Sequence, residues 1–102
     1  MAKVVFTPES REDLKNIVRY TKETWGNEQA IEYVSGLRKQ TSLLAQRADI
    51  GKNREDLAAG LICFPYVSHI VYYAQIPDGI AIIRFLHKQQ DPTIHMRKGG
   101  NT

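Results

Sequence analysis

The sequence has 102 residues, of which 42% are hydrophobic and 25% charged, with a formal net charge of +3 at pH 7. These values predict one folded globular domain and exclude a disordered chain. The single cysteine, Cys63, excludes an internal disulfide, and no apolar run approaches the ~18 residues of a membrane span. The N-terminal residues do not form a signal peptide, so we expect a cytoplasmic protein with no membrane partner.

The first part of the chain predicts a strand followed by a helix. Residues 3–7 are rich in β-branched and aromatic side chains, which is typical of a strand. Thr7 suits the N-cap of the following helix, and Pro8 suits its first position, where the missing N–H costs nothing. One face of this helix carries a largely apolar stripe at helical spacing, namely Leu14, Ile17, Val18, Thr21 and Trp25.

A second helix is predicted directly after the first. Gly26 suits the left-handed end of the first helix, and Asn27 suits the N-cap of the second. A heptad-like stripe follows at Ala30, Val34, Leu37, Thr41, Leu44 and Ala48. Because the connection between the helices is so short, we expect them to pack as an antiparallel hairpin.

The second half of the chain predicts a loop and three strands. Residues 49–60 are polar, so we expect a loop with one short helical turn at 54–58. Short turns then separate three strand candidates, which are residues 61–66, 69–76 and 80–87. The order β-α-α-β-β-β predicts an α+β fold, with the helical hairpin packed on one face of a small antiparallel sheet. We expect one domain over residues 1–91 and a partly flexible tail over 92–102.

The last two strands predict a sheet that is apolar on both faces. In a regular strand 80–87, one face carries Ala81, Ile83, Phe85 and His87, and the other carries Ile80, Ile82, Arg84 and Leu86. A sheet with one solvated face would alternate between apolar and polar residues instead. The helical hairpin can cover only one face, so we expect the tail or a partner protein to cover the other. The alternative is a curved sheet whose second face stays half-exposed.

Arg84 and His87 are the residues that most suggest acid–base chemistry. They lie three positions apart, so a regular strand places them on opposite faces, and we expect Arg84 to pair with an acidic group. The histidines, His69, His87 and His95, lack the spacing of a metal site, so no metal or cofactor is expected. Several basic residues could form a phosphate-binding patch or be ordinary surface charges. These residues are Lys52, Arg54, Lys88, Arg97 and Lys98.

Several segments, in their order along the chain, resemble the ParE toxins of the RelE/ParE superfamily. The most specific are RYTKETWG (19–26), DIGKNREDLAAGL (49–61), SHIVYY (68–73) and IIRFLHKQQD (82–91). The resemblance covers roughly residues 4–91. The fold of the family, a helical hairpin on a small antiparallel sheet, agrees with the predicted order of elements.

This resemblance implies a toxin of a type II toxin–antitoxin system that inhibits DNA gyrase by stabilising its complex with cleaved DNA. Such a toxin is not an enzyme and needs no cofactor. A ParD-like antitoxin would neutralise it, and DNA would be contacted only through gyrase or the antitoxin. The residues that we expect to recognise the target or the antitoxin are Arg84, His87, Lys88, His69, Tyr73, Trp25 and Arg54.

The RelE branch of the superfamily supplies an alternative function, ribosome-dependent cleavage of mRNA. Here such an enzyme would use His87, His95 and Arg84. All five tyrosines precede the last strand, and glutamines follow it where these ribonucleases tend to have basic residues. The sequence therefore favours gyrase inhibition. A further alternative is a degenerate member that only binds antitoxin. The sequence also departs from the family at Ile62, where many ParE toxins have an arginine that could contact the target or the antitoxin.

Overall fold

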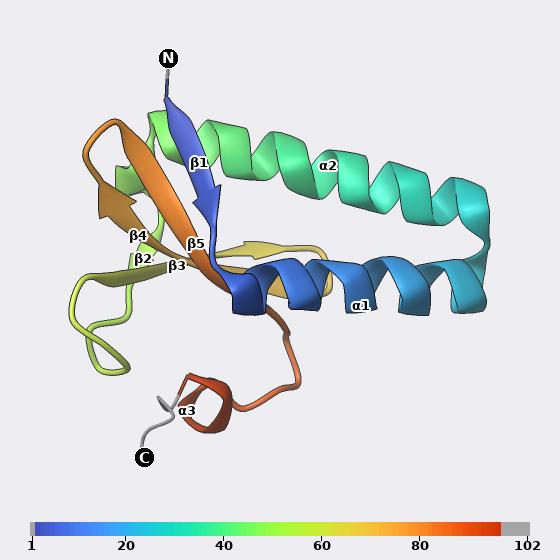
Figure 1. The fold of residues 1–102 in the computed structure, drawn as a ribbon. Helices are drawn as coiled ribbons and strands as arrows, with labels where there is room; N and C mark the ends of the chain where they lie inside the picture. The colour runs from blue at the N-terminus through green and yellow to red at the C-terminus, as the bar shows by residue number, and fades with distance from the viewer. Residues whose placement is uncertain (1, 97–102) are drawn as a thin grey trace.

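The chain forms a five-stranded mixed sheet with two long helices on one face (Figure 1). The structure is a computed structural model and describes residues 2–96. Its elements are β1 (Lys3–Phe6), α1 (Pro8–Trp25), α2 (Asn27–Gln46), a 3₁₀ turn (Ala48–Ile50), β2 (Lys52–Asn53), β3 (Leu61–Tyr66), β4 (His69–Ile76), β5 (Gly79–His87) and α3 (Pro92–His95). The predicted α+β fold, with its helical hairpin and its antiparallel meander β3–β4–β5, is confirmed.

Two short strands widen the sheet beyond the predicted meander. The strand order is β1-β5-β4-β3-β2, in which β1 runs parallel to β5 and β2 runs antiparallel to β3. The predicted short helical turn at 54–58 is present as a single turn that does not continue into a helix, in which the carbonyl of Arg54 accepts the N–H groups of Leu57 and Ala58.

Local capping chemistry explains where the helical hairpin begins and turns. The hydroxyl oxygen of Thr7 accepts the N–H of Ser10 at 3.1 Å, which confirms Thr7 as the N-cap of α1. Gly26 ends this helix with a φ of +96°, a conformation that favours glycine. The predicted N-cap of α2 was wrong by one residue. Asn27 is already helical, and Gly26 precedes α2 without a side-chain cap.

The apolar stripe predicted on α1 is correct only in its middle. Ile17 and Thr21 are buried, whereas Val18 and Trp25 are exposed. Figure 1 gives the reason: the helical hairpin extends past the edge of the sheet, so the far end of α1 has no sheet to pack against. Trp25 is therefore free for another role.

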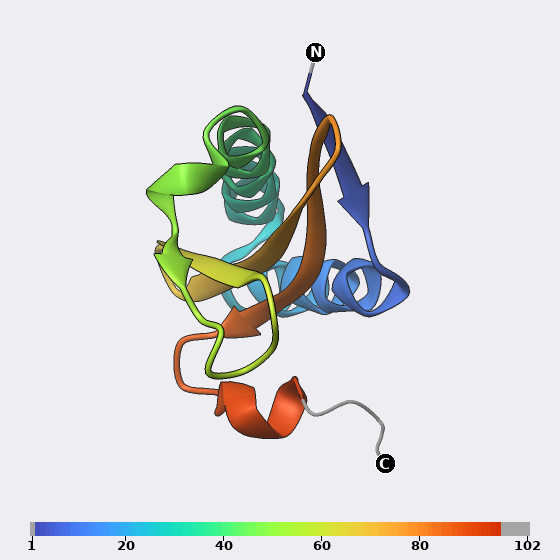
Figure 2. The same ribbon diagram turned by 90° about the vertical axis from the view of Figure 1, so that its left-hand side faces the viewer.

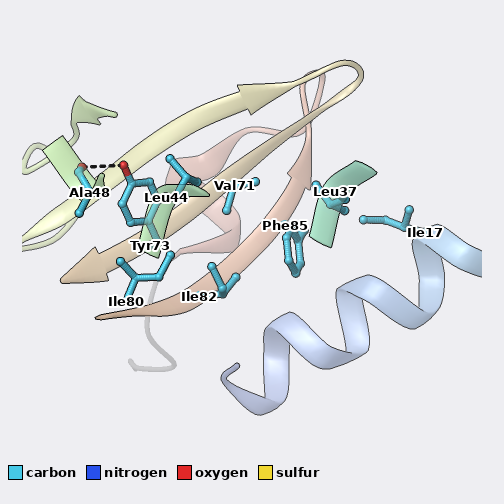
Figure 3. Packing of buried hydrophobic residues seen from close by; sticks show 9 residues of the cluster. All are labelled: Ile17, Leu37, Leu44, Ala48, Val71, Tyr73, Ile80, Ile82 and Phe85. Carbon is cyan, nitrogen blue, oxygen red and sulfur yellow. Dashed lines mark hydrogen bonds between the residues drawn. The ribbon is translucent and has the colours of Figure 1, made fainter. Parts of the chain in front are cut away.

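The main core lies between the two long helices and the sheet (Figure 3). Its buried members are Ile17, Leu37, Leu44, Ala48, Val71, Tyr73, Ile80, Ile82 and Phe85. Tyr73 lies fully inside this core, and its hydroxyl donates to the carbonyl of Ala48 at 2.9 Å. That bond satisfies the polar end of a buried phenol, so Tyr73 packs without an orphaned hydroxyl.

A β-bulge in β5 changes which side chains face the helices. The pairing with β4 shifts between Tyr72 and Tyr73, which leaves Ile83 without a partner of its own. The regular alternation predicted for this strand is therefore wrong, because the extra residue reverses the faces from that point onward. The helix side carries Ile80, Ile82, Phe85 and His87, and the other side carries Ala81, Ile83, Arg84 and Leu86.

The second face of the sheet is covered by the chain itself (Figure 2). Residues 54–60 and α3 lie on the side of the sheet opposite α2, and Leu57 and Met96 pack against the sheet there. They bury a smaller core of Leu61, Cys63, Tyr72 and Leu86. Of the two covers expected for this face, the tail or a partner, the tail supplies one part through α3 and Met96, and the loop before β3 supplies the rest. The end of the tail, predicted to be flexible, lies outside the described residues.

Candidate functional site

A groove of about 490 Å³ opens where the helical hairpin passes over the turn between β3 and β4. We call it the hairpin groove. Its walls come from both long helices and from the strand ends beneath them. Figure 1 shows how α1 and α2 pass over these strand ends. The lining residues are Tyr20, Thr21, Trp25, Gln29, Glu32, Tyr33, Tyr66, Val67, Ser68, His69 and His87.

The hydroxyl of Tyr33 organises the centre of the hairpin groove. It donates to the carbonyl of Tyr66 and accepts the N–H of Ser68, both at 3.2 Å. It also lies 2.8 Å from Nδ1 of His69. Either the Tyr33 hydroxyl or Nδ1 can be the donor in this contact, depending on the tautomer of His69.

His87 accepts a hydrogen bond from the backbone that follows β5. The N–H of Gln89 donates to Nδ1 of His87 at 3.1 Å, so the proton of the neutral ring lies on Nε2. His69 and His87 are paired across β4 and β5, and their rings meet edge to face with centroids 5.3 Å apart. The hairpin groove thus contains two imidazole rings side by side, with a hydrogen-bond donor on Nε2 of the neutral His87 ring. We call these two residues the histidine pair.

The hairpin groove carries little charge. Burial, reinforced by the nearby His87, lowers the pKa of His69 to about 4, so this ring is neutral at pH 7. Burial also raises the pKa of Tyr33, so its hydroxyl stays protonated. Among the residues that line the hairpin groove, Glu32 alone belongs to a type charged at pH 7. The surface is therefore aromatic and hydrogen-bonding, with one negative charge and no cation.

Large apolar side chains surround the hairpin groove. Tyr20, Trp25 and Val67 are 63%, 68% and 64% exposed, although all three belong to types that usually lie inside proteins. Val67 is held outward in the β3–β4 turn, where its φ is +50°. A cluster of exposed apolar groups around a hollow is typical of an interaction surface.

The structure brings together three of the residues expected to act in recognition, namely His69, His87 and Trp25. Arg84 lies elsewhere. Its Nε and Nη2 donate to Asp13 at 2.7 and 2.9 Å, and its Nη1 donates to the carbonyl of His95 at 2.8 Å. The expected acidic partner of Arg84 is therefore confirmed, and so is its place on the face opposite His87. The three residues proposed for a ribonuclease are linked through the end of the chain, because Arg84 bonds the carbonyl of His95, and the side chain of Gln90 contacts the N–H of His87 and the ring of His95.

The other expected recognition residues lie outside the hairpin groove. Tyr73 is in the main core rather than on the surface, since its side chain is needed to fill the space beneath α2. Arg54 pairs with Asp56 at 2.9 Å in the loop before β3. Lys88 is exposed just after β5, where its N–H donates to the carbonyl of Ser68.

Sequence reasoning missed the aromatic walls of the hairpin groove. The sequence predicts no recognition role for Tyr20, Tyr33 or Tyr66. Tyr33 lies beside the core stripe of α2, and nothing in its local pattern shows that its hydroxyl reaches a turn 35 positions later. The short connection at Gly26 predicts that the aromatic end of α1 lies beside the start of α2. It does not predict that both pack against the turn between β3 and β4.

Two absences bear on the kinds of site that the described residues can form. Within residues 2–96, no group of three or more His, Cys, Asp or Glu side chains could hold a metal ion. Over the same stretch, no helix combines the length and the hydrophobicity needed to span a bilayer.

Similarity to known proteins decides the family. The family model described as "ParE toxin of type II toxin-antitoxin system, parDE" matches residues 4–92. The chain belongs to the ParE toxin family. It is thus a ParE-like toxin of a type II toxin–antitoxin system, as the motifs in the sequence predicted.

Individual relatives agree with this assignment. The ParE-family chain is 31% identical over 87 residues to "Toxin ParE1" of Caulobacter vibrioides, a match that covers 85% of this chain and 90% of that protein. It also resembles a chain in a solved structure described as "Chromosomal ParDE TA system from P. aeruginosa", with a TM-score of 0.72. That match covers 85% of this chain and 96% of the other at 21% identity, so it establishes the shared fold.

Proposed function

We propose that this ParE-family toxin inhibits growth by binding DNA gyrase in the cytoplasm and stabilising the complex of gyrase with cleaved DNA. A ParD-like antitoxin binds the toxin and neutralises it. Family membership over residues 4–92 carries this proposal. The exposed aromatic surface around the hairpin groove supports it, since a toxin that acts by binding needs such a surface.

The arrangement of charged groups supports binding rather than catalysis. Cleavage of RNA needs a base and an acid at the scissile phosphate, together with cations that hold the phosphate. Arg84 is occupied by Asp13 and lies on the face opposite His87. The histidine pair faces Glu32, whose carboxylate would repel a phosphate.

A gyrase cleavage assay tests this proposal. The purified toxin is incubated with gyrase, ATP and supercoiled plasmid, and the products are resolved after protease treatment. We expect linear DNA that depends on both proteins, and its disappearance when a ParD-like antitoxin is added first. Omission of gyrase is the matched control.

A parallel assay on translating ribosomes tests the ribonuclease alternative. Cut mRNA without gyrase-dependent DNA breaks would overturn the proposal in favour of an enzyme of the RelE kind. A toxin that binds antitoxin but produces neither kind of break, and does not slow growth, would be a degenerate family member.

A further inference from the structure

The hairpin groove is the middle of a longer channel. A neighbouring hollow of about 500 Å³ shares Glu32 and Tyr66 with it and continues along α2. Another, of about 450 Å³, shares Tyr20 and the histidine pair and continues toward the end of β5. Each hollow alone has the size of a small-molecule site, but three in a row form a track that suits an extended or helical polypeptide segment.

The apolar groups of this channel are placed as anchors for such a segment. Trp25 and Val67 stand at the hairpin groove, and Ile31 lies in the hollow along α2 with 69% of its surface exposed. Gly36 lets the ring of Tyr66 lie close against α2 in that hollow, because a Cβ there would collide with the Tyr66 hydroxyl. The channel therefore offers apolar contacts on both sides of Glu32.

The charge of the channel points to a basic partner. Glu28 and Glu32 lie one helical turn apart on α2 and both line the channel. No ion pair among the described residues engages either of them. Lys39 lies farther along α2, and the hairpin groove itself has no cation. On a chain with net charge +3, this local excess of negative charge favours lysine or arginine and disfavours nucleic acid.

The histidine pair adds a hydrogen-bonding group to the channel. Nε2–H of the neutral His87 ring can donate, and the ring of His69 lies against it edge to face, with centroids 5.3 Å apart. A carbonyl oxygen of a polypeptide backbone, or of an asparagine or glutamine side chain, can accept this hydrogen bond.

We propose that this channel is the surface through which the toxin docks a basic, amphipathic polypeptide segment of gyrase, with Glu32 pairing a lysine or arginine and Trp25 packing on its apolar side. The inference rests on the proposed function, which names gyrase as the target. It adds where on the toxin that contact lies and what chemistry the contacting segment of gyrase must have.

The test compares charge and anchor variants of the full-length toxin in the gyrase cleavage assay. Glu32→Lys and Trp25→Ala each change an exposed or lining residue outside the core. We expect each to raise the toxin concentration needed for half-maximal DNA cleavage at least tenfold. Glu32→Gln, which keeps the shape and removes the charge, should give a smaller rise and a weaker dependence on salt.

Glu12→Lys is the matched control. Glu12 is exposed on α1 and lies outside the channel. The Glu12→Lys variant changes the net charge as Glu32→Lys does, and we expect it to inhibit gyrase like the natural toxin. Far-ultraviolet circular dichroism and thermal melting confirm that each variant is folded. If Glu32→Lys fails this check, Glu32→Gln and Trp25→Ala still decide the outcome.

The possible results separate the two proposals. Full gyrase inhibition by the folded Glu32→Lys and Trp25→Ala variants would overturn the docking inference and leave the proposed function standing. Loss of antitoxin binding alone, with gyrase inhibition intact, would show that the channel binds the antitoxin and would also overturn the docking inference. Loss of self-association alone would assign it to a second copy of the chain. A natural toxin without any gyrase effect would overturn both proposals.

Discussion

The guanidinium of Arg84 ties together three segments that lie far apart in the sequence. It donates twice to Asp13 on α1 and once to the carbonyl of His95 in α3, while Asp13 also accepts the N–H of Phe85 at 3.0 Å. Both side chains of this ion pair are largely buried. The pair thus joins the first turns of α1 to the end of β5 that extends beyond its pairing with β1, and to α3, which covers the second face of the sheet.

Asp13→Ala should destabilise the toxin strongly. It leaves a largely buried guanidinium and the Phe85 N–H without their acceptor, which is expected to cost about 2–4 kcal/mol of unfolding free energy. Urea unfolding followed by circular dichroism measures this. Asp56→Ala, which breaks the exposed pair with Arg54, is the control and should change stability little. Equal losses in the two variants would contradict the structural role assigned to Asp13.

His69 should make the stability of the toxin depend on pH. Its pKa is about 4 in the folded chain and near 6.5 when exposed, so the unfolded chain binds the proton more readily between these values. Stability is therefore full above pH 6.5 and falls as the pH drops toward 4. Because the ring is partly exposed, we expect about 1–2 kcal/mol rather than the full amount.

Thermal or urea unfolding at a series of pH values between 4 and 7 tests the role of His69. His69→Gln cannot titrate, so its stability should fall less steeply across this range. The residual slope in that variant reports the other titratable groups of the chain. A variant with the same slope as the natural chain would show that His69 is not the group responsible.

At the scale of the element, the join between β1 and β5 depends on a glycine. Gly79 begins β5 directly opposite Lys3, and a Cβ at this position would collide with the backbone of Lys3. Gly79→Ala should therefore push β1 away and destabilise the chain by about 1–3 kcal/mol. Thr7 follows β1, and its N–H donates to the carbonyl of Ile82 in β5. Hydrogen exchange should therefore show lost protection at the Thr7 N–H.

Gly60→Ala is a useful comparison for Gly79→Ala. Gly60 has a φ of +75° but an added Cβ would meet no atom within 4 Å, so its cost comes from backbone strain alone. Its effect should stay within the loop before β3 and leave exchange at Thr7 unchanged. Loss of protection at Thr7 in both variants would mean that β1 responds to any destabilisation rather than to the contact at Gly79.

The elements that could be predicted are those determined by nearby residues. The cap at Thr7, the left-handed Gly26 and the alternation in β4 are local patterns, and they placed the hairpin and the meander correctly. The bulge in β5 could not be predicted, because nothing in the local alternation marks it and the residues just after it, Arg84 and Phe85, meet Asp13 across 71 and 72 positions. The hairpin groove was missed for the same reason, since Tyr33 meets His69 only after the sheet has formed.

At the scale of the whole molecule, the sheet separates two cores of unequal depth. The main core is sealed by two long helices, whereas the second is closed by a loop and one short helix. Four residues of α3 cannot hold a helix by themselves, so α3 depends on contacts such as the Arg84 bond to the His95 carbonyl. We therefore expect this cover to open more readily than the helical hairpin.

Cys63 reports that opening, because it is the only cysteine and lies buried in the second core. Met96→Ala removes an apolar contact on this core and should raise the rate at which a thiol reagent labels Cys63 several-fold, at a cost of about 1–2 kcal/mol in stability. Ile94→Ala, at an exposed position of the same helix, should leave the rate unchanged. If both variants label at the natural rate, α3 does not guard the second core, and the loop before β3 is its main cover.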